Sequence, residues 1–153
     1  MQLNSFCMLD VECCSPRTTA LEAAHITRRK HTGDLVVVDD DETRPTPLGV
    51  ITDRDIVVEV LAKGLDPEVT TVGSVIRTPV VVADGAEDSS QVLERMREQG
   101  VRRIPVVGAG GKLIGIVTVD DLIKRLAADA ALLTDVIARE QGREARSRRS
   151  LSE

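Results

Sequence analysis

Short apolar runs of strand length occur in the same order in two parts of the chain. LVVVD (35–39) matches IPVVG (104–108), and each run is bounded by residues that favour turns. A second apolar run follows each of them, LGVIT (48–52) and LIGIVT (113–118). The pattern therefore predicts two β-hairpins of one design, present twice in the chain.

The turns of the two hairpins differ in length and composition. The first is the long, polar segment DDETRPTP (40–47), and the second is the short, glycine-rich segment AGGK (109–112). Since a longer surface turn costs little free energy, this difference leaves the repeated design intact.

An amphipathic stretch comes before each hairpin and predicts a helix. These stretches are TALEAAHITRRKH (19–31) and EDSSQVLERMREQG (87–100). In the second stretch we expect Val92, Leu93 and Met96 to lie on one apolar face that packs in the core.

Further elements complete each copy. Short apolar runs, VECC (11–14) and VVVA (80–83), precede the predicted helices. After each hairpin, apolar residues recur at helical spacing and predict a closing helix; they are Ile56, Val57, Val60 and Leu61, then Leu122, Ile123, Leu126 and Ala127. Each copy is thus predicted to be a β-α-β-β-α unit, and the chain to be an α+β protein.

The duplication has a physical reason. A three-stranded sheet with two helices on one face leaves its other face uncovered, so each unit covers what the other leaves exposed. We expect the first unit at 11–62, a linker at 63–73, the second unit at 74–127, a C-terminal helix at 128–142 and a disordered basic tail at 143–153.

The predicted C-terminal helix has its own apolar face, formed by Leu132, Leu133, Val136 and Ile137. We expect this face to dock on the pair of units or on a partner protein, and the helix to stop at Gly142.

Composition and charge exclude several classes of protein. Hydrophobic residues make up 42% of the 153 residues and charged residues 29%, the balance of a folded globular protein. The formal net charge of -5 gives no global attraction to nucleic acid. No apolar window is long enough to span a membrane, and the first residues do not resemble a secretory signal. We therefore expect a cytoplasmic protein.

The cysteines do not suggest a disulfide framework, because Cys7, Cys13 and Cys14 are odd in number and two are adjacent. With His25 and His31 they are the chain's soft metal ligands, but none of the known zinc spacings is present. Idle thiols are the favoured interpretation, and metal or redox sensing by Cys13, Cys14 and His31 is a weaker one.

The most informative motif is a repeated phrase, GVITDRDIVVEVL (49–61) and GIVTVDDLIKRLA (115–127). In both copies a strand ends in Thr and a helix begins, with Asp three residues later. A structural interpretation is a capping box, in which Thr52 caps the helix with Asp55, and Thr118 with Asp121.

A functional interpretation uses the same geometry. A helix N-terminus at the carboxyl end of a strand offers unpaired amides and a fixed carboxylate, which suit the hydroxyls of a ribose, while Arg side chains bind phosphates. Arg54, Arg102 and Arg103 are the candidates. Since side chains alternate along a strand, only one of Arg102 and Arg103 faces such a cleft easily.

Taken together, TGDLVVVDDDETRPTPLGVITDRDIVVEVL and GVRRIPVVGAGGKLIGIVTVDDLIKRL resemble a tandem pair of CBS domains, the modules named after cystathionine β-synthase. The resemblance spans about residues 11 to 127. It implies two units packed as a pseudo-twofold pair, a homodimer, and an adenosine ligand such as AMP, ADP, ATP or S-adenosylmethionine between the units. It also implies that Thr52 with Asp55, and Thr118 with Asp121, hold the ribose or phosphate.

The second phrase departs from the first. Val119 and Asp120 stand where the first phrase has Asp53 and Arg54, so an extra carboxylate lies at that helix start and makes a triphosphate harder to place.

Two hypotheses follow. The first is a non-catalytic regulatory module that binds an adenine nucleotide, has no obligatory cofactor and acts on a regulated partner protein. The second is an interaction or dimerisation module without a ligand. No catalytic motif or Walker-type phosphate loop supports an enzyme.

Overall fold

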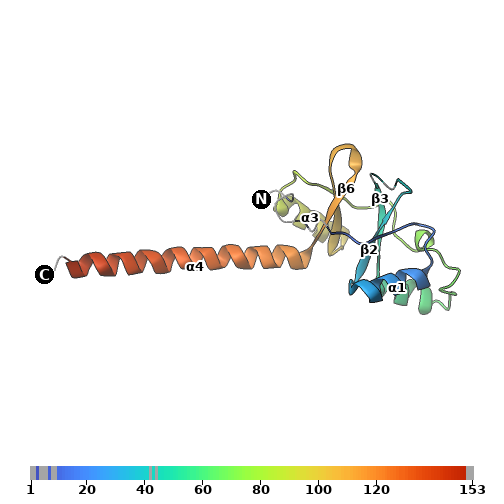
Figure 1. Ribbon diagram of the computed structural model, residues 1–153, viewed down its shortest axis with the longest axis horizontal. Coiled ribbons are helices and arrows are strands. Elements are labelled where there is room, and N and C mark those ends of the chain that lie inside the picture. Colours follow the sequence, from blue (N-terminus) through green and yellow to red (C-terminus); the bar gives the residue numbers. More distant parts are fainter. Residues whose placement is uncertain (1–2, 4–6, 8–9, 42, 44, 151–153) are drawn as a thin grey trace. The chain divides into compact units, whose positions relative to one another are not determined.

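The computed structural model describes the chain apart from residues 1–2, 4–6, 8–9, 42, 44 and 151–153, and gives the backbone alone for 145–150. The chain divides into two compact units, Met1–Thr118 and Val119–Glu153. The first unit holds both copies of the hairpin, and the second is formed by the helix α4 (Figure 1).

Two three-stranded sheets form the centre of the first unit, in the orders β1-β2-β3 and β4-β5-β6. In each sheet the first strand pairs parallel to the second, and the second pairs antiparallel to the third. The predicted duplication and the α+β class are confirmed. The strands are β1 (Cys13–Cys14), β2 (Asp34–Val38), β3 (Pro47–Thr52), β4 (Ala83–Asp84), β5 (Arg103–Val107) and β6 (Leu113–Thr118).

The two hairpins share one register. Val37 lies opposite Gly49 in the first, and Val106 lies opposite Gly115 in the second. Each ladder shifts at the residue that follows, so the irregularity is repeated as well. The short second turn contains the 3₁₀ turn η4 (Ala109–Gly111), where two glycines have positive φ. The difference between the two hairpins is therefore confined to the turn.

The helices α1 (Ala20–Lys30) and α3 (Ser89–Gln99) begin where capping residues predict. Thr19 and Asp88 are the N-caps, and each forms a reciprocal capping box with the third helical residue. Val92 and Met96 are buried, but Leu93 is 43% exposed. The prediction that Leu93 shares the core face is wrong, because Leu93 lies one residue, about 100°, around the helix from Val92.

The closing helix of the first copy changes its hydrogen-bonding pattern after one turn. α2 (Asp53–Asp55) continues as the π-helix η2 (Ile56–Leu61), in which the Ala62 amide donates to the Val57 carbonyl (2.8 Å). Ile56 and Val60 are buried, whereas Val57 and Leu61 are more than half exposed. The predicted single apolar stripe is therefore only half buried.

The core of the first copy lies between its sheet, its helices and the segment after η2. Val72 of the 3₁₀ turn η3 (Val72–Ser74) belongs to this core, and its amide donates to the Thr18 carbonyl (2.8 Å). Backbone pairing of Thr19 with Thr71 adds to that contact. The buried members are Cys14, Ala23, Leu35, Val37, Ile51, Ile56 and Val72.

The second unit is one uninterrupted helix, α4 (Val119–Ser150), of 32 residues. The predictions of a stop at Gly142 and of a disordered tail from residue 143 are wrong as far as Ser150; residues 151–153 lie outside the described part. A glycine within a helix costs only about 1 kcal/mol relative to Ala, and Gln141 and Arg143 beside it favour helix. Across the described residues, no helix is both long enough and apolar enough to cross a membrane.

Candidate functional site

The junction of β3 and α2 forms a complete capping box. The Asp55 amide donates to Thr52 Oγ1 (3.0 Å), while the Thr52 amide (2.9 Å) and hydroxyl (2.7 Å) both donate to Asp55 Oδ2. Both residues are half-buried. The structural interpretation of this phrase is therefore confirmed for the first copy.

The box leaves part of the Asp55 carboxylate available. Among the described residues, the Asp55 carboxylate accepts hydrogen bonds only at Oδ2. The other oxygen, Oδ1, is held in a fixed position at the start of α2, because the box restrains the carboxylate. Such an oxygen is an acceptor for a hydroxyl group of a ligand.

Arg54 lies beside this carboxylate and is exposed. Its backbone amide donates to Asp53 Oδ1 (2.7 Å), and within the described part of the chain its guanidinium takes part in no ion pair. A solvated cation next to a helix N-terminus suits an anionic group of a ligand.

Arg103 has a different environment, because it forms an ion pair with Asp34 of the first copy. Its side chain is 28% exposed and that of Asp34 18%. Arg103 begins β5 and lies opposite Thr118, while Asp34 begins β2 and lies opposite Thr52. The ion pair therefore joins the two sheets beside Thr52 and Thr118, the two predicted capping residues.

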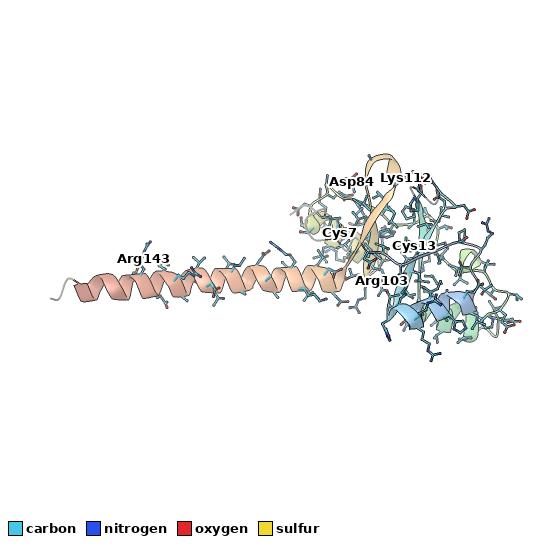
Figure 2. All side chains as sticks on the ribbon, viewed as in Figure 1. Cys7, Cys13, Asp84, Arg103, Lys112 and Arg143 are labelled. Carbon is cyan, nitrogen blue, oxygen red and sulfur yellow. The ribbon has the colours of Figure 1, made fainter. Side chains whose placement is uncertain are left out.

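A second contact joins the copies at the other end of the sheets, and Figure 2 shows Arg103 and Lys112 at these opposite ends. The Leu113 amide donates to the Pro45 carbonyl (2.8 Å), and Lys112 Nζ donates to Thr46 Oγ1 (3.2 Å). The longer first turn thus meets the shorter second one.

The sequence did not decide which of Arg102 and Arg103 is directed towards the other copy, and the structure distinguishes them. Arg102 is exposed, whereas Arg103 is half-buried and directed at the first copy. Arg102 precedes β5, and Arg103, the first residue of that strand, is the one whose side chain meets the first copy. Its ion pair with Asp34 was not predicted.

For the second phrase, Thr118 ends β6, and Asp120 and Asp121 lie in the first turn of α4. Asp121 thus belongs to the second unit, and its part in a site with Thr118 stays a prediction.

The cysteines lie in or near the core. Cys14 is buried, and its burial, together with the neighbouring Cys13 thiol, raises its pKa to about 11. Burial also raises the pKa of Cys13, and the nearby Glu12 adds to the rise. His31 is exposed and ends α1 in a left-handed conformation. Three or more metal-ligating side chains do not come together anywhere in the described residues.

The sequence pattern did not predict the two least exposed ion pairs of the described residues, Asp34 with Arg103 and Glu87 with Arg95. A signal for the first was present, because Asp34 and Arg103 occupy equivalent positions of the two copies and carry opposite charges. Residues on a pseudo-twofold axis meet their own equivalents. No comparable signal pointed to Glu87 and Arg95.

Two β-α-β-β-α units in tandem define a duplicated α+β module. The chain belongs to the CBS domain family, because the model of the CBS domain matches it twice, over residues 5–62 and 72–128.

Two curated relatives cover most of the chain. An uncharacterised protein of Methanopyrus kandleri is 34% identical over 75% of this chain and 57% of its own length. Hypoxic response protein 1 of Mycobacterium tuberculosis is 36% identical over 78% of this chain and 81% of its own length. The chain thus spans little more than half of the Methanopyrus protein.

Solved structures share the fold. Hypoxic Response Protein I, determined with two coordinated zinc ions, has a TM-score of 0.71 at 33% identity, over 81% of this chain and 98% of its own. A CBS protein of Pyrobaculum aerophilum complexed with AMP has a TM-score of 0.71 at 21% identity, over 80% and 90%. At that lower identity the likeness shows the fold alone.

An enzyme also matches, but only in part. Inosine-5'-monophosphate dehydrogenase of Mycobacterium bovis is 32% identical over 72% of this chain, which is 20% of the enzyme. The shared segment of this chain is the CBS region.

Proposed function

We propose that this chain is a non-catalytic regulatory module that binds an adenine nucleotide or a related adenosyl ligand: AMP, ADP, ATP or S-adenosylmethionine. The observation that carries the proposal is the Asp55 carboxylate, which the capping box fixes through Oδ2 at the start of α2. Its Oδ1 atom accepts a ribose hydroxyl. The amides of Asp53, Arg54 and Asp55 already donate to acceptors within the chain, so the ligand contact at this junction falls to the carboxylate.

The phosphate contact falls to Arg54 in this proposal. Arg54 is exposed beside the helix start, whereas Arg103 is engaged by Asp34. Arg103 can bind a phosphate only if its ion pair with Asp34 breaks. Its main role in this proposal is therefore to stabilise the contact between the two copies. For the second copy we propose Thr118 and Asp121 as the ribose contacts and Arg102 as a further phosphate contact, with the extra carboxylate of Asp120 disfavouring a triphosphate.

The relatives support the ligand class through the fold. The Pyrobaculum protein was determined with AMP. The CBS pair of the protein MJ0100, 22% identical, was determined with 5'-methylthioadenosine and S-adenosyl-L-methionine. Both fold neighbours hold adenosyl compounds, and the present chain has the carboxylate that such a ligand requires.

We further propose that the protein is a cytoplasmic homodimer, and that binding of the ligand changes its interaction with a regulated partner protein. Three free cysteines, two of them buried, fit a reducing compartment. A regulatory effect requires that the ligand bind two conformations with different affinity. The alternative is an interaction module in which Thr52 and Asp55 act as a helix cap only.

Asp55→Ala separates the two functions in a thermal-shift assay. Its matched control is Glu22→Ala, which removes the same partner from the capping box of α1, where Glu22 Oε2 accepts from the Thr19 amide (2.8 Å). Each variant is expected to lose about 1 kcal/mol of stability. At ligand concentrations far above Kd, wild type and Glu22→Ala gain several degrees in Tm and Asp55→Ala gains none. Equal gains in all three proteins would refute the role of Asp55.

A further inference from the structure

The helix α4 carries an apolar stripe at alternating spacings of three and four residues. Its large members are Ile123, Leu126, Leu133 and Ile137, with Ala130 completing the repeat. The four large side chains are 55–68% exposed. This stripe is not explained by the nucleotide site.

Such a stripe has the period of a helix-to-helix seam. Apolar residues repeating every 3.5 positions keep one face towards a partner helix, where each side chain enters a space between four others. A helix in water gains most of its stability from packing its apolar face. Leu132 and Val136, exposed by 62% and 63%, widen the face on one side.

We propose that the stripe is covered by α4 of a second copy of this chain, packed antiparallel about a twofold axis near Ala128. With that axis, every seam residue faces an apolar one, which makes the stripe self-complementary. The opposed pairs are Ile123 with Leu133, Leu126 with Ala130, and Val119 with Ile137.

Charge selects the antiparallel arrangement. The first turn of α4 is acidic, with Asp120 and Asp121, whereas residues 139–149 contain five Arg and two Glu. In an antiparallel pair Arg139 lies within about one turn of Asp120 of the other helix, the remaining arginines extend past the start of that helix, and the helix dipoles are opposed. A parallel pair would bring the two basic ends together.

The polar residues that continue the seam also favour the antiparallel arrangement. Glu140 and Glu144 continue the spacing after Ile137. In a parallel pair each glutamate would face its own copy, which is repulsive. In the antiparallel pair both lie past the start of the other helix. Near the axis Asp129 approaches its copy, but Arg125 Nη2 contacts its Oδ1 at 3.1 Å and offsets that charge.

Sedimentation of the full chain over a concentration series tests the surface. Leu133→Glu puts a charge in the seam, and Ala131→Glu puts the same charge on the outer face as the matched control. Wild type and Ala131→Glu are expected to be dimers. Leu133→Glu is expected to have a dimer dissociation constant at least ten times that of wild type. Circular dichroism checks that all three are folded. A monomeric wild type, or a dimer unchanged by Leu133→Glu, would overturn the proposal.

Cross-linking with a short bismaleimide tests the direction. Two copies of Asp129→Cys meet near the axis, whereas two copies of Ile137→Cys lie about 27 Å apart along the helices. We expect dimer bands for Asp129→Cys, and for Ile137→Cys only the background of the wild-type cysteines. The reverse result would mean a parallel pair. Neither assay contains nucleotide, so failure here is distinct from failure of the proposed ligand site.

Discussion

At the scale of single residues, Glu87 has a carboxylate that accepts hydrogen bonds at both of its oxygens. Arg95 Nη2 donates to its Oε2 (2.7 Å), and Arg95 Nη1 donates to its Oε1 (3.1 Å) and to the Val82 carbonyl (2.8 Å). The Arg95 hydrogen bonds lower the pKa of Glu87 below its ordinary value of 4.5. Arg95 thereby fastens α3 to the turn that precedes this helix, through Glu87, and to the segment before β4, through Val82.

We predict that Glu87→Gln lowers the free energy of unfolding at pH 7 by about 1 kcal/mol, an amount limited by the partial exposure of both side chains. The matched control is Glu94→Gln, which loses an exposed ion pair with Arg97 and is expected to change little. Urea unfolding of both variants checks the difference.

The pH dependence has a definite sign. Because the folded pKa of Glu87 is lowered, its contribution is complete above pH 4.5 and is lost as the pH falls through the folded value. Wild type and Glu87→Gln should therefore converge in stability as the pH falls below 4.5 and through the lowered folded pKa of Glu87. A gap that stays constant with pH would mean that the lost stability does not come from the charge.

At the scale of elements, Gly49 explains why the repeated phrase begins with glycine in the first copy. A Cβ atom there would lie 2.7 Å from Cδ1 and 3.0 Å from Cβ of Ile76. Ile76 packs against the core of the first copy from the segment after η3. The strand β3 thus needs a residue without a side chain where that segment crosses it.

We predict that Gly49→Ala costs about 1–3 kcal/mol of stability through overpacking. Adding Ile76→Ala removes the nearest side-chain atom, so the double variant should lose less than the two single losses combined. Denaturant unfolding of the four proteins measures this coupling. Strictly additive losses would show that Gly49 and Ile76 do not compete for space.

Elements with strong local signals were predicted well. The helical stretches 19–31 and 87–100 and the repeated hairpins depend on neighbouring residues, and the structure confirms a helix within each stretch and both hairpins. The π-helical closing segment and the continuity of α4 through Gly142 were not predicted. Both depend on small differences between backbone hydrogen-bonding patterns, which side-chain periodicity does not report.

The candidate site was predicted in part for the same reason. Thr52 and Asp55 lie three residues apart, so the sequence defines their hydrogen bonds. Arg103 and Asp34 are distant in the chain, and their contact exists only once the copies pack together. The periodic pattern placed Arg103 directly before a predicted strand, but it did not identify Asp34 as the partner of Arg103.

At the scale of the whole molecule, the ion pair of Asp34 with Arg103 tests the pseudo-twofold relation. The two residues are equivalent in the two copies, so exchanging them should restore the contact. We predict that Arg103→Asp alone costs about 2 kcal/mol or more, because two carboxylates then face each other in a half-buried place. Asp34→Arg with Arg103→Asp should recover most of that loss. Thermal unfolding that shows no recovery would contradict the symmetric arrangement.

The central claim is that the junction of β3 and α2 binds an adenosyl ligand. Isothermal titration calorimetry of the full chain with AMP, ADP, ATP and S-adenosylmethionine tests it most directly. The account predicts a saturable heat with at least one of them, lost in Asp55→Ala and kept in Glu22→Ala. No heat from any of the four at millimolar concentration would contradict it.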